Sequence, residues 1–196
     1  MMKGAVARSR PVFVAIGMGG NVGDPRRAFR LALQTLHPLL GNPKISPLYR
    51  TSPVGGPFDQ PDYLNAVVVG TTSLAAHALL ALLRNVERVA GRKPVAEKDA
   101  PRPLDLDLLL YGDERTATRR LTVPHPRLTS RLFVLVPLAD VAPRRVVPGT
   151  GKTVARLLAE ARRRSTESVR RVRQAGVARA GARRAAQPRT GKASSG

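Results

Sequence analysis

The stretch APRPLDLDLLLYG, residues 100–112, sets two aspartates one residue apart within a run of leucines. Leucine-rich runs are usually buried, whereas aspartate is a poor strand former. Because successive side chains of a strand point to opposite faces, this run predicts a strand whose even-numbered leucines face the core. Asp105 and Asp107 then share the other face with Leu109 and Tyr111. Two neighbouring carboxylates repel each other unless a cation binds them, so this strand is expected to carry a functional site as well as to build the core.

Strands and amphipathic helices alternate on either side of this strand. Asp24 can cap a helix with Pro25 at its first position, and Gly91 can end a second helix. The alternation predicts an α/β (α+β) layered sandwich with a mostly antiparallel sheet. The expected strands or extended segments span 11–18, 45–54 and 62–73, the expected helices 24–39, 75–91 and 153–164, and a short buried element 131–143.

The composition fits one globular domain followed by a basic tail. With 196 residues, of which 42% are hydrophobic, the chain can bury a sizeable core, and its lack of cysteine rules out disulfides and thiolate metal sites. No apolar run reaches the ~18 residues that span a bilayer, so we expect a cytoplasmic protein with no membrane partner. The formal net charge is +21, and residues 160–196, with eleven basic and two acidic residues, contribute nine of these charges.

The charge is also spread over the body of the chain, which favours anionic ligands in general. Residues 11–160 are predicted to form the domain and residues 161–196 a disordered basic tail. Contact of the tail with nucleic acid is conceivable, but a solvated tail is the simpler interpretation and no function is expected of such contact.

Two glycine-containing segments look like nucleotide-binding loops but lack the required spacing. In GMGGNVG, residues 17–23, Val22 stands where a dinucleotide loop needs its third glycine, and the acidic residue expected further on is missing. In VVPGTGKT, residues 146–153, Val146 stands where a phosphate-binding loop needs its first glycine. Nicotinamide, flavin and P-loop chemistry are therefore disfavoured, and the second segment is expected to be a turn that caps the last helix.

The aspartates are surrounded in sequence by the groups that phosphoryl transfer needs. Carboxylates two residues apart can hold Mg²⁺ jointly with substrate phosphates. Arg102 lies between two prolines, and so does His125, which makes their segments stiff and extended. Arginines near them can supply positive charge to phosphate oxygens. These arginines are Arg92, Arg120, Arg127 and Arg131.

Together these segments make the chain resemble the 6-hydroxymethyl-7,8-dihydropterin pyrophosphokinase (2-amino-4-hydroxy-6-hydroxymethyldihydropteridine diphosphokinase) family of folate biosynthesis. The matching segments follow the family's order over about residues 11–160: GGNVGD, SPLYRTSPVGGPFDQPDYLNAVV, VERVAGR, PRPLDLDLLLYG, LTVPHPRL and RLFVLVPLADVAP. The resemblance implies a three-layer α/β/α sandwich around a mainly antiparallel sheet with a ferredoxin-like core. It also implies an enzyme that transfers the β,γ-diphosphate of ATP to the hydroxymethyl group of the reduced pterin and releases AMP. We expect it to act as a monomer.

The resemblance also implies roles for individual residues. Asp105 and Asp107 would hold two Mg²⁺ ions, and either could accept the hydroxyl proton, while Arg92 and Arg102 would act on the transferring phosphates. The residues implied to bind the nucleotide are His125, Arg131, Arg120, Thr122 and Glu87. The residues implied to bind the pterin are Tyr63 and Phe133 as stacking rings, Asn65 as a polar partner, and Thr51, Ser52 and Val54 as lining.

The loop before the aspartate strand departs from the family's pattern. The family often carries arginine, tryptophan and glycine there, in a loop that closes over the substrates. Lys93 and Lys98 can replace part of the missing charge, but closure and rate are put in question. The differing residues are Pro94, Val95, Asp99 and Ala100.

Two other hypotheses fit parts of the sequence. A related transferase on the same scaffold could act on another heterocycle, since fold does not fix function. A basic RNA-associated protein with a relic of the pocket would fit the charge, although sparse aromatic residues and the lack of a nucleic-acid motif count against it.

Overall fold

A six-stranded antiparallel sheet forms the centre of the molecule, in the strand order β10-β3-β4-β1-β5, with β2 also paired to β4. The structure is a computed structural model and describes residues 10–53, 60–92 and 100–172. The strands of this sheet are β1 (Val12–Gly20), β2 (Gly41–Ile45), β3 (Tyr49–Thr51), β4 (Tyr63–Thr72), β5 (Asp105–Tyr111) and β10 (Val169–Arg171).

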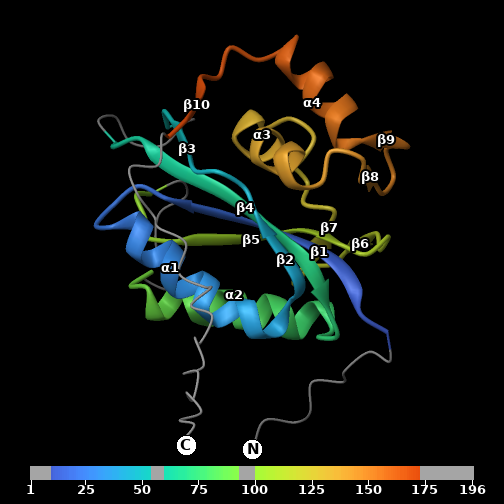
Figure 1. Cartoon of the computed structure of the whole chain (residues 1–196), viewed down its shortest axis with the longest axis horizontal. Coiled ribbons are helices and arrows are strands. Elements are labelled where there is room, and N and C mark those ends of the chain that lie inside the picture. Colours follow the sequence, from blue (N-terminus) through green and yellow to red (C-terminus); the bar gives the residue numbers. More distant parts are fainter. Residues whose placement is uncertain (1–9, 54–59, 93–99, 173–196) are drawn as a thin grey trace, which may run out of the picture.

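Helices cover both faces of the sheet, as Figure 1 shows. Helices α1 (Pro25–Leu36) and α2 (Ala76–Val89) lie on one face, and α3 (Leu132–Val141) and α4 (Val154–Arg162) lie on the other. Strand β1 lies between β4 and β5, which is the strand arrangement of a ferredoxin-like βαββαβ core. The predicted three-layer α/β/α sandwich is confirmed. The shorter elements are η1 (His37–Leu39), β6 (Thr116–Ala117), β7 (Thr122–Val123), β8 (Val146–Val147) and β9 (Lys152–Thr153).

Local sequence signals account for the helix boundaries. Helix α1 begins at Pro25 because Asp24 caps it, with its Oδ1 accepting a hydrogen bond from the Arg27 N–H at 3.0 Å. Helix α4 is capped by Thr153, whose Oγ1 accepts from the Arg156 N–H at 3.3 Å. The segment that resembles a phosphate-binding loop is therefore the β8–β9 hairpin followed by a helix cap, as predicted.

A β-bulge in β5 changes which residues share a face. Ile16 of β1 pairs with Leu108, but its neighbour Ala15 pairs with Leu110, so Leu109 is an extra residue in the ladder. Leu109 keeps the face of the aspartates as predicted, whereas Leu110 joins it on the α3 side. The predicted position of Tyr111 is wrong, because the bulge turns its ring to the α1–α2 side of the sheet.

The segment 131–143, expected to be a short buried element, contains helix α3. It is apolar almost all round because it lies between the sheet and α4, and six of its ten residues are buried. The Tyr49 hydroxyl of β3 donates a hydrogen bond to Asp140 Oδ2 at 2.6 Å, which ties β3 to the end of this helix.

Strand β10 lies beyond the predicted domain boundary at residue 160. It pairs with β3 through Val169–Thr51 and Arg171–Tyr49, so the sheet continues past the point where a disordered tail was expected to begin. Residues 173–196 of that predicted tail fall outside the described residues. Within the described part of the chain, none of the helices has the length and apolar character that crossing a membrane requires.

Candidate functional site

A pocket opens on the sheet face that carries α3 and α4. Strands β1, β4 and β5 form its floor, and the start of α3 forms one wall. It contains about 820 Å³ of atom-free space, with open solvent at its mouth included. Nine predicted site residues line it: Asp105, Asp107, Arg102, Thr51, Ser52, Tyr63, Asn65, Arg131 and Phe133.

Glycines of β1 keep the pocket floor open beside the two aspartates. Gly19 pairs with Asp105 and Gly17 pairs with Asp107, and both glycines line the pocket. A Cβ added to Gly19 would lie 3.4 Å from Asn65 Oδ1, so a larger side chain there would project into the pocket. The glycine cluster therefore does not form a dinucleotide loop; it leaves space above a strand.

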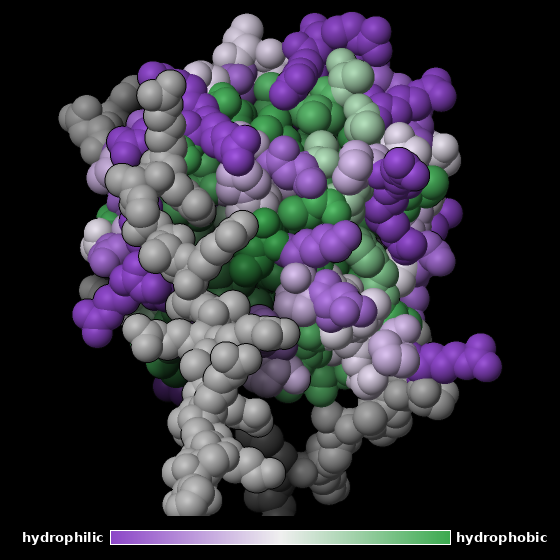
Figure 2. All heavy atoms as spheres, viewed as in Figure 1, coloured by the Kyte–Doolittle hydropathy of each residue, from purple (hydrophilic) through white to green (hydrophobic). Residues whose placement is uncertain are grey.

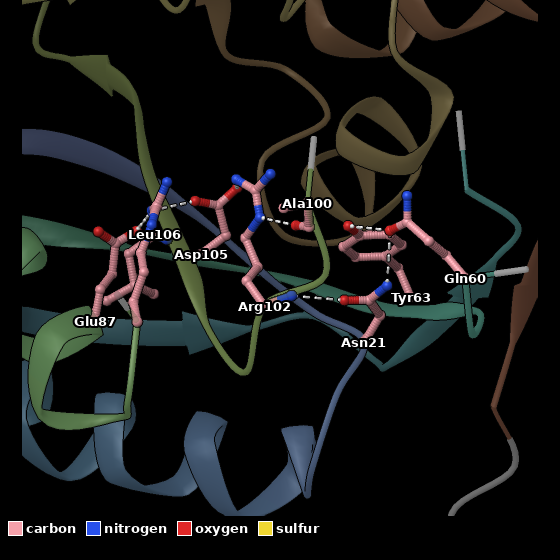
Figure 3. Close-up of polar contacts among 9 residues, drawn as sticks. Asn21, Gln60, Tyr63, Glu87, Ala100, Arg102, Asp105 and Leu106 are labelled. Atoms are coloured by element: carbon pink, nitrogen blue, oxygen red, sulfur yellow. Dashed lines mark hydrogen bonds and ion pairs between the residues drawn. The ribbon is translucent and has the colours of Figure 1, made fainter. Parts of the chain in front are cut away.

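Two arginines hold the carboxylate of Asp105. Arg92 Nη1 donates to Oδ1 at 2.6 Å, and Arg102 Nη1 donates to Oδ2 at 3.2 Å. Arg102 Nε also donates to the carbonyl oxygen of Ala100 at 3.0 Å, which fixes its guanidinium plane (Figure 3). Because the side chains of Asp105 and Arg92 are 28% and 33% exposed, these ion pairs position charge in the pocket more than they stabilise the fold.

Glu87 supports this cluster from α2. Its side chain is buried, and it accepts hydrogen bonds from the Leu106 N–H at 2.7 Å and from Arg92 Nη1. Burial raises the pKa of Glu87 to about 7 and the charge of Asp105 adds to the rise, while the Leu106 N–H and Arg92 oppose it. Glu87 thus contacts protein groups at the base of the site, where it orients Arg92 and fixes the start of β5.

Asp107 and His125 form the second charged part of the site. Burial raises the pKa of Asp107, and the negative charge of Asp105 adds to the rise, whereas the neighbouring His125 and the positive charges of Arg131 and Arg92 oppose it. The backbone N–H of His125 donates a hydrogen bond to the Leu109 carbonyl at 2.9 Å. The ring Nδ1 of His125 accepts one from the backbone N–H of Arg127 at 3.1 Å. Burial lowers the pKa of His125 although Asp107 opposes this. A neutral imidazole with its proton on Nε2 fits these surroundings.

The pocket also contains an aromatic ring, Phe133 of α3, and a fixed amide, Asn65, which lies across β1 from Asp105. Asn65 Nδ2 donates to Thr51 Oγ1 at 2.8 Å, so its orientation is set between β4 and β3. The Arg131 guanidinium lies over the Phe133 ring, 5.1 Å from its centroid. Charged groups together with a ring and a fixed amide in one pocket suit a ligand that joins phosphates to a flat heterocycle.

Asn21 connects three segments next to the pocket residues Arg102 and Tyr63, a role that was not predicted from the sequence. Its N–H donates to the Arg102 carbonyl at 3.0 Å, and its Oδ1 accepts from the Arg102 N–H at 2.9 Å. Its Nδ2 donates to Gln60 Oε1 at 3.2 Å and to the Pro61 carbonyl at 3.3 Å. Gln60 Oε1 also accepts from the Tyr63 hydroxyl at 3.3 Å (Figure 3). Asn21 and Gln60 lie within segments that matched the family, and that was the only signal for them.

Some predicted residues lie away from this pocket or outside the described residues. Thr122 is in β7, which lies beside β5, and the exposed Arg120 comes two residues before it. Val54 and the loop positions 93–99 lie outside the described residues, so the predicted lining by Val54 and the departures in the loop stay predictions.

The donor set fits a cation that arrives with its own ligands. Among residues 10–53, 60–92 and 100–172, no group of three or more acidic or histidine side chains could hold a metal ion. Asp105 and Asp107 supply carboxylate oxygens on one face of one strand. Mg²⁺ prefers six oxygen ligands and commonly takes several from water and nucleotide phosphates. A carboxylate pair without further protein ligands therefore suits Mg²⁺ bound together with a nucleotide.

The fold and the site define a class. Paired carboxylates and arginines beside a pocket for a flat ligand are characteristic of enzymes that transfer phosphoryl groups to small molecules. Residues 15–143 match the family described as 7,8-dihydro-6-hydroxymethylpterin-pyrophosphokinase (HPPK). The chain belongs to this family.

Curated relatives agree with the family match. The chain is 42% identical over 145 residues to the 2-amino-4-hydroxy-6-hydroxymethyldihydropteridine pyrophosphokinase of Synechocystis sp., covering 73% of each protein. It is 39% identical over 148 residues to the enzyme of the same name from Pseudomonas aeruginosa, covering 74% of this chain and 90% of that protein. It is 44% identical to a mitochondrial folate synthesis bifunctional protein of Arabidopsis thaliana, but it spans only 23% of that protein.

The fold also matches solved structures. An HPPK–DHPS triple mutant of Plasmodium falciparum superposes with a TM-score of 0.61 at 13% sequence identity, over 77% of this chain and 43% of that one. At this identity the comparison supports the fold alone. The chain spans less than half of that bifunctional protein, so the likeness concerns one part of it.

Proposed function

We propose that this chain transfers the β,γ-diphosphate of ATP to the hydroxymethyl group of 6-hydroxymethyl-7,8-dihydropterin and releases AMP, as an enzyme of folate biosynthesis. The observation that carries the proposal is one pocket that joins the carboxylates Asp105 and Asp107 to the amide and ring of Asn65 and Phe133. The curated relatives that bear this name cover most of the chain and support the same reaction.

The charged end of the pocket would bind the triphosphate. We propose that Asp105 and Asp107 hold two Mg²⁺ ions. When bound, these ions would neutralise the phosphate charge and align the β-phosphorus for attack. Arg92 and Arg102, which donate to Asp105, are placed to turn toward phosphate oxygens once the carboxylate binds a cation. Arg131 and His125 would carry further phosphate charge from the α3 side.

The other end would bind the pterin. Because the Arg131 guanidinium covers one face of the Phe133 ring, the opposite face is the one for stacking on the pterin. Asn65, held by Thr51, would pair with the donor and acceptor edge of the heterocycle, and Tyr63 would bound the slot on its other side.

The chemical step then needs no covalent intermediate. The hydroxymethyl oxygen of the pterin attacks the β-phosphorus, and the bond from this phosphorus to the α,β-bridging oxygen breaks. That oxygen leaves with AMP, and one of the two carboxylates accepts the hydroxyl proton. The product is the pterin diphosphate ester. We propose that the enzyme acts as a monomer in the cytoplasm.

The direct test is turnover of the purified protein with Mg²⁺, ATP and the reduced pterin alcohol. We expect AMP and the pterin diphosphate in equal amounts. Asp105→Ala and Asp107→Ala should each lower kcat by at least about 10³-fold, because each removes a ligand of the phosphate-bound cation. Asp113→Ala is the matched control, since Asp113 is 89% exposed beyond the far end of β5 and contacts Arg145.

Several results would contradict the proposal. A folded protein that releases no AMP with the reduced pterin would favour a relic pocket, and transfer to a different heterocycle would favour the related transferase. Near-normal turnover of Asp105→Ala or Asp107→Ala would remove the role given to the carboxylate pair. Chelation with EDTA should stop turnover and excess Mg²⁺ should restore it.

A further inference from the structure

The last described segment of the chain, residues 165–172, contacts two walls of the pocket. Ser165 Oγ accepts a hydrogen bond from the Glu167 N–H at 3.1 Å, which fixes the turn after α4. Glu167 then reaches α3, and β10 joins the sheet beside β3. The family match ends at residue 143, so this segment lies beyond the part of the chain that defines the family.

Glu167 caps helix α3 from a distance of 35 residues along the chain. Its Oε2 accepts a hydrogen bond from the Leu132 N–H at 3.1 Å. Arg131, at the N-cap position, makes no side-chain hydrogen bond of the capping kind, and a carboxylate at a helix N-terminus is also favoured by the helix dipole. Leu132 lies between Arg131 and Phe133, so Glu167 fixes the backbone that carries both pocket side chains.

Strand β10 fixes a second wall of the pocket. Val169 pairs with Thr51, and the Val172 N–H donates to the Leu48 carbonyl at 2.8 Å. Thr51 in turn accepts the hydrogen bond of the Asn65 amide. The same short segment therefore holds the helix that carries the ring and the strand that orients the amide.

We propose that Glu167 is a positioning residue for the heterocycle-binding end of the pocket. It acts through Arg131 and Phe133 and touches neither substrate. The inference rests on the proposed function, because the heterocycle is taken to be the reduced pterin. Asp105 and Asp107 stand on β5, which Glu167 does not contact in the described hydrogen bonds. Changing Glu167 should therefore weaken binding of the pterin more than binding of the nucleotide, for which Arg131 is one of several charged groups.

The test compares binding of the reduced pterin with binding of a non-hydrolysable ATP analogue by titration calorimetry. Glu167→Ala should weaken pterin binding about tenfold, which corresponds to ~1.4 kcal/mol, and weaken binding of the analogue with Mg²⁺ no more than about twofold, because Arg131 shares the phosphates with several other groups. Glu167→Gln keeps an acceptor oxygen and should restore most of the affinity. Glu160→Ala is the matched control, because Glu160 bonds only Lys152 and Arg156 in the described structure and lies on α4.

A double-mutant cycle separates positioning from a general loss of stability. If Glu167 acts through the ring, Glu167→Ala should have little further effect on pterin affinity in a Phe133→Ala background. Equal weakening of both ligands, or unchanged pterin affinity in Glu167→Ala, would overturn the inference. Failure of the wild-type chain to bind the pterin at all would instead overturn the proposed function, and this inference with it.

Discussion

Neighbouring glycines at the end of β1 meet different surroundings. Gly19 faces the pocket, with Asn65 Oδ1 at 3.4 Å from an added Cβ. Gly20 faces the loop before β5, and its added Cβ would lie 2.5 Å from the Pro103 carbonyl oxygen and 3.3 Å from the Pro25 ring. Adjacent positions therefore serve the site and the fold respectively, because successive residues of a strand point to opposite faces.

The two positions allow a prediction with a built-in contrast. Gly19→Val should leave the melting temperature within a few degrees of wild type but lower pterin affinity at least about tenfold, since β-branched residues suit strands and the new methyl groups fill the slot. Gly20→Ala should lower the free energy of unfolding by about 1–3 kcal/mol, because the Pro103 backbone must shift to relieve the overlap. Thermal unfolding and pterin titration of both variants check this. Normal pterin affinity in a folded Gly19→Val variant would argue against the assigned pterin slot.

At the scale of elements, β3 and α3 are joined by a hydrogen bond from Tyr49 to Asp140. The two oxygens are 2.6 Å apart, and the ring of Tyr49 is buried. Burial, then this hydrogen bond and the negative charge of Asp140, raise the pKa of Tyr49 to about 12. Because β3 carries Thr51 and α3 carries Phe133, the bond helps to set the distance between two walls of the pocket.

Tyr49→Phe should lower the free energy of unfolding by about 1.5–3 kcal/mol at neutral pH, the usual effect of losing a hydrogen bond to a charged group. Tyrosine in an unfolded chain ionises near pH ~10. Since the folded pKa is raised, the stabilisation is complete below that value and is lost as the pH rises through about 12. Denaturant unfolding of both proteins at several alkaline pH values should therefore show their difference shrinking, and a constant difference would contradict the assigned contact.

The sequence was sufficient to predict an element wherever one local signal determines it. Asp24 and Pro25 indicated the start of α1, and short apolar runs indicated β1, β4 and β5. It was insufficient to predict features that depend on pairing between distant segments. The bulge at Leu109 depends on pairing with β1, and nothing in the apolar run of β5 marks it. Likewise β10 is a basic, three-residue strand whose sequence resembles the tail around it, and only its pairing with β3 reveals it.

The candidate site was predictable to a similar extent. Asp105 and Asp107 are conspicuous because carboxylates are rare in leucine runs, and most residues implied by the resemblance converge on one pocket. Asn21 and Gln60 were missed as site residues because polar residues in glycine- and proline-containing loops are ordinary. Their roles arise from hydrogen bonds across 39 positions of sequence. The Glu167 cap has the same origin.

At the scale of the whole molecule, the formal charge of +21 is not confined to the predicted tail. Hydrophilic side chains gather at the top of the face in Figure 2, over the position of α4, where Arg156, Arg162, Arg163 and Arg164 are exposed. A protein with this surplus of positive charge attracts anionic substrates over distances comparable with the Debye length. A neutral heterocycle experiences no such attraction.

Salt should therefore affect the two substrates differently. Raising the NaCl concentration from about 0.05 M to about 0.5 M should raise KM for ATP roughly three- to tenfold, while KM for the pterin changes less than about twofold. Steady-state kinetics with each substrate varied in turn measures this, and potassium acetate in place of NaCl controls for effects of chloride. Equal changes in both KM values would show that salt acts on the fold or on the chemical step.

The position of β10 also matters while the chain is being made. The ribosome synthesises β5 well before residues 165–172. A nascent chain therefore already contains both proposed metal ligands while β3 still lacks its pairing with β10. Competence to bind the heterocycle should thus come last during translation, after the final edge of the sheet has docked.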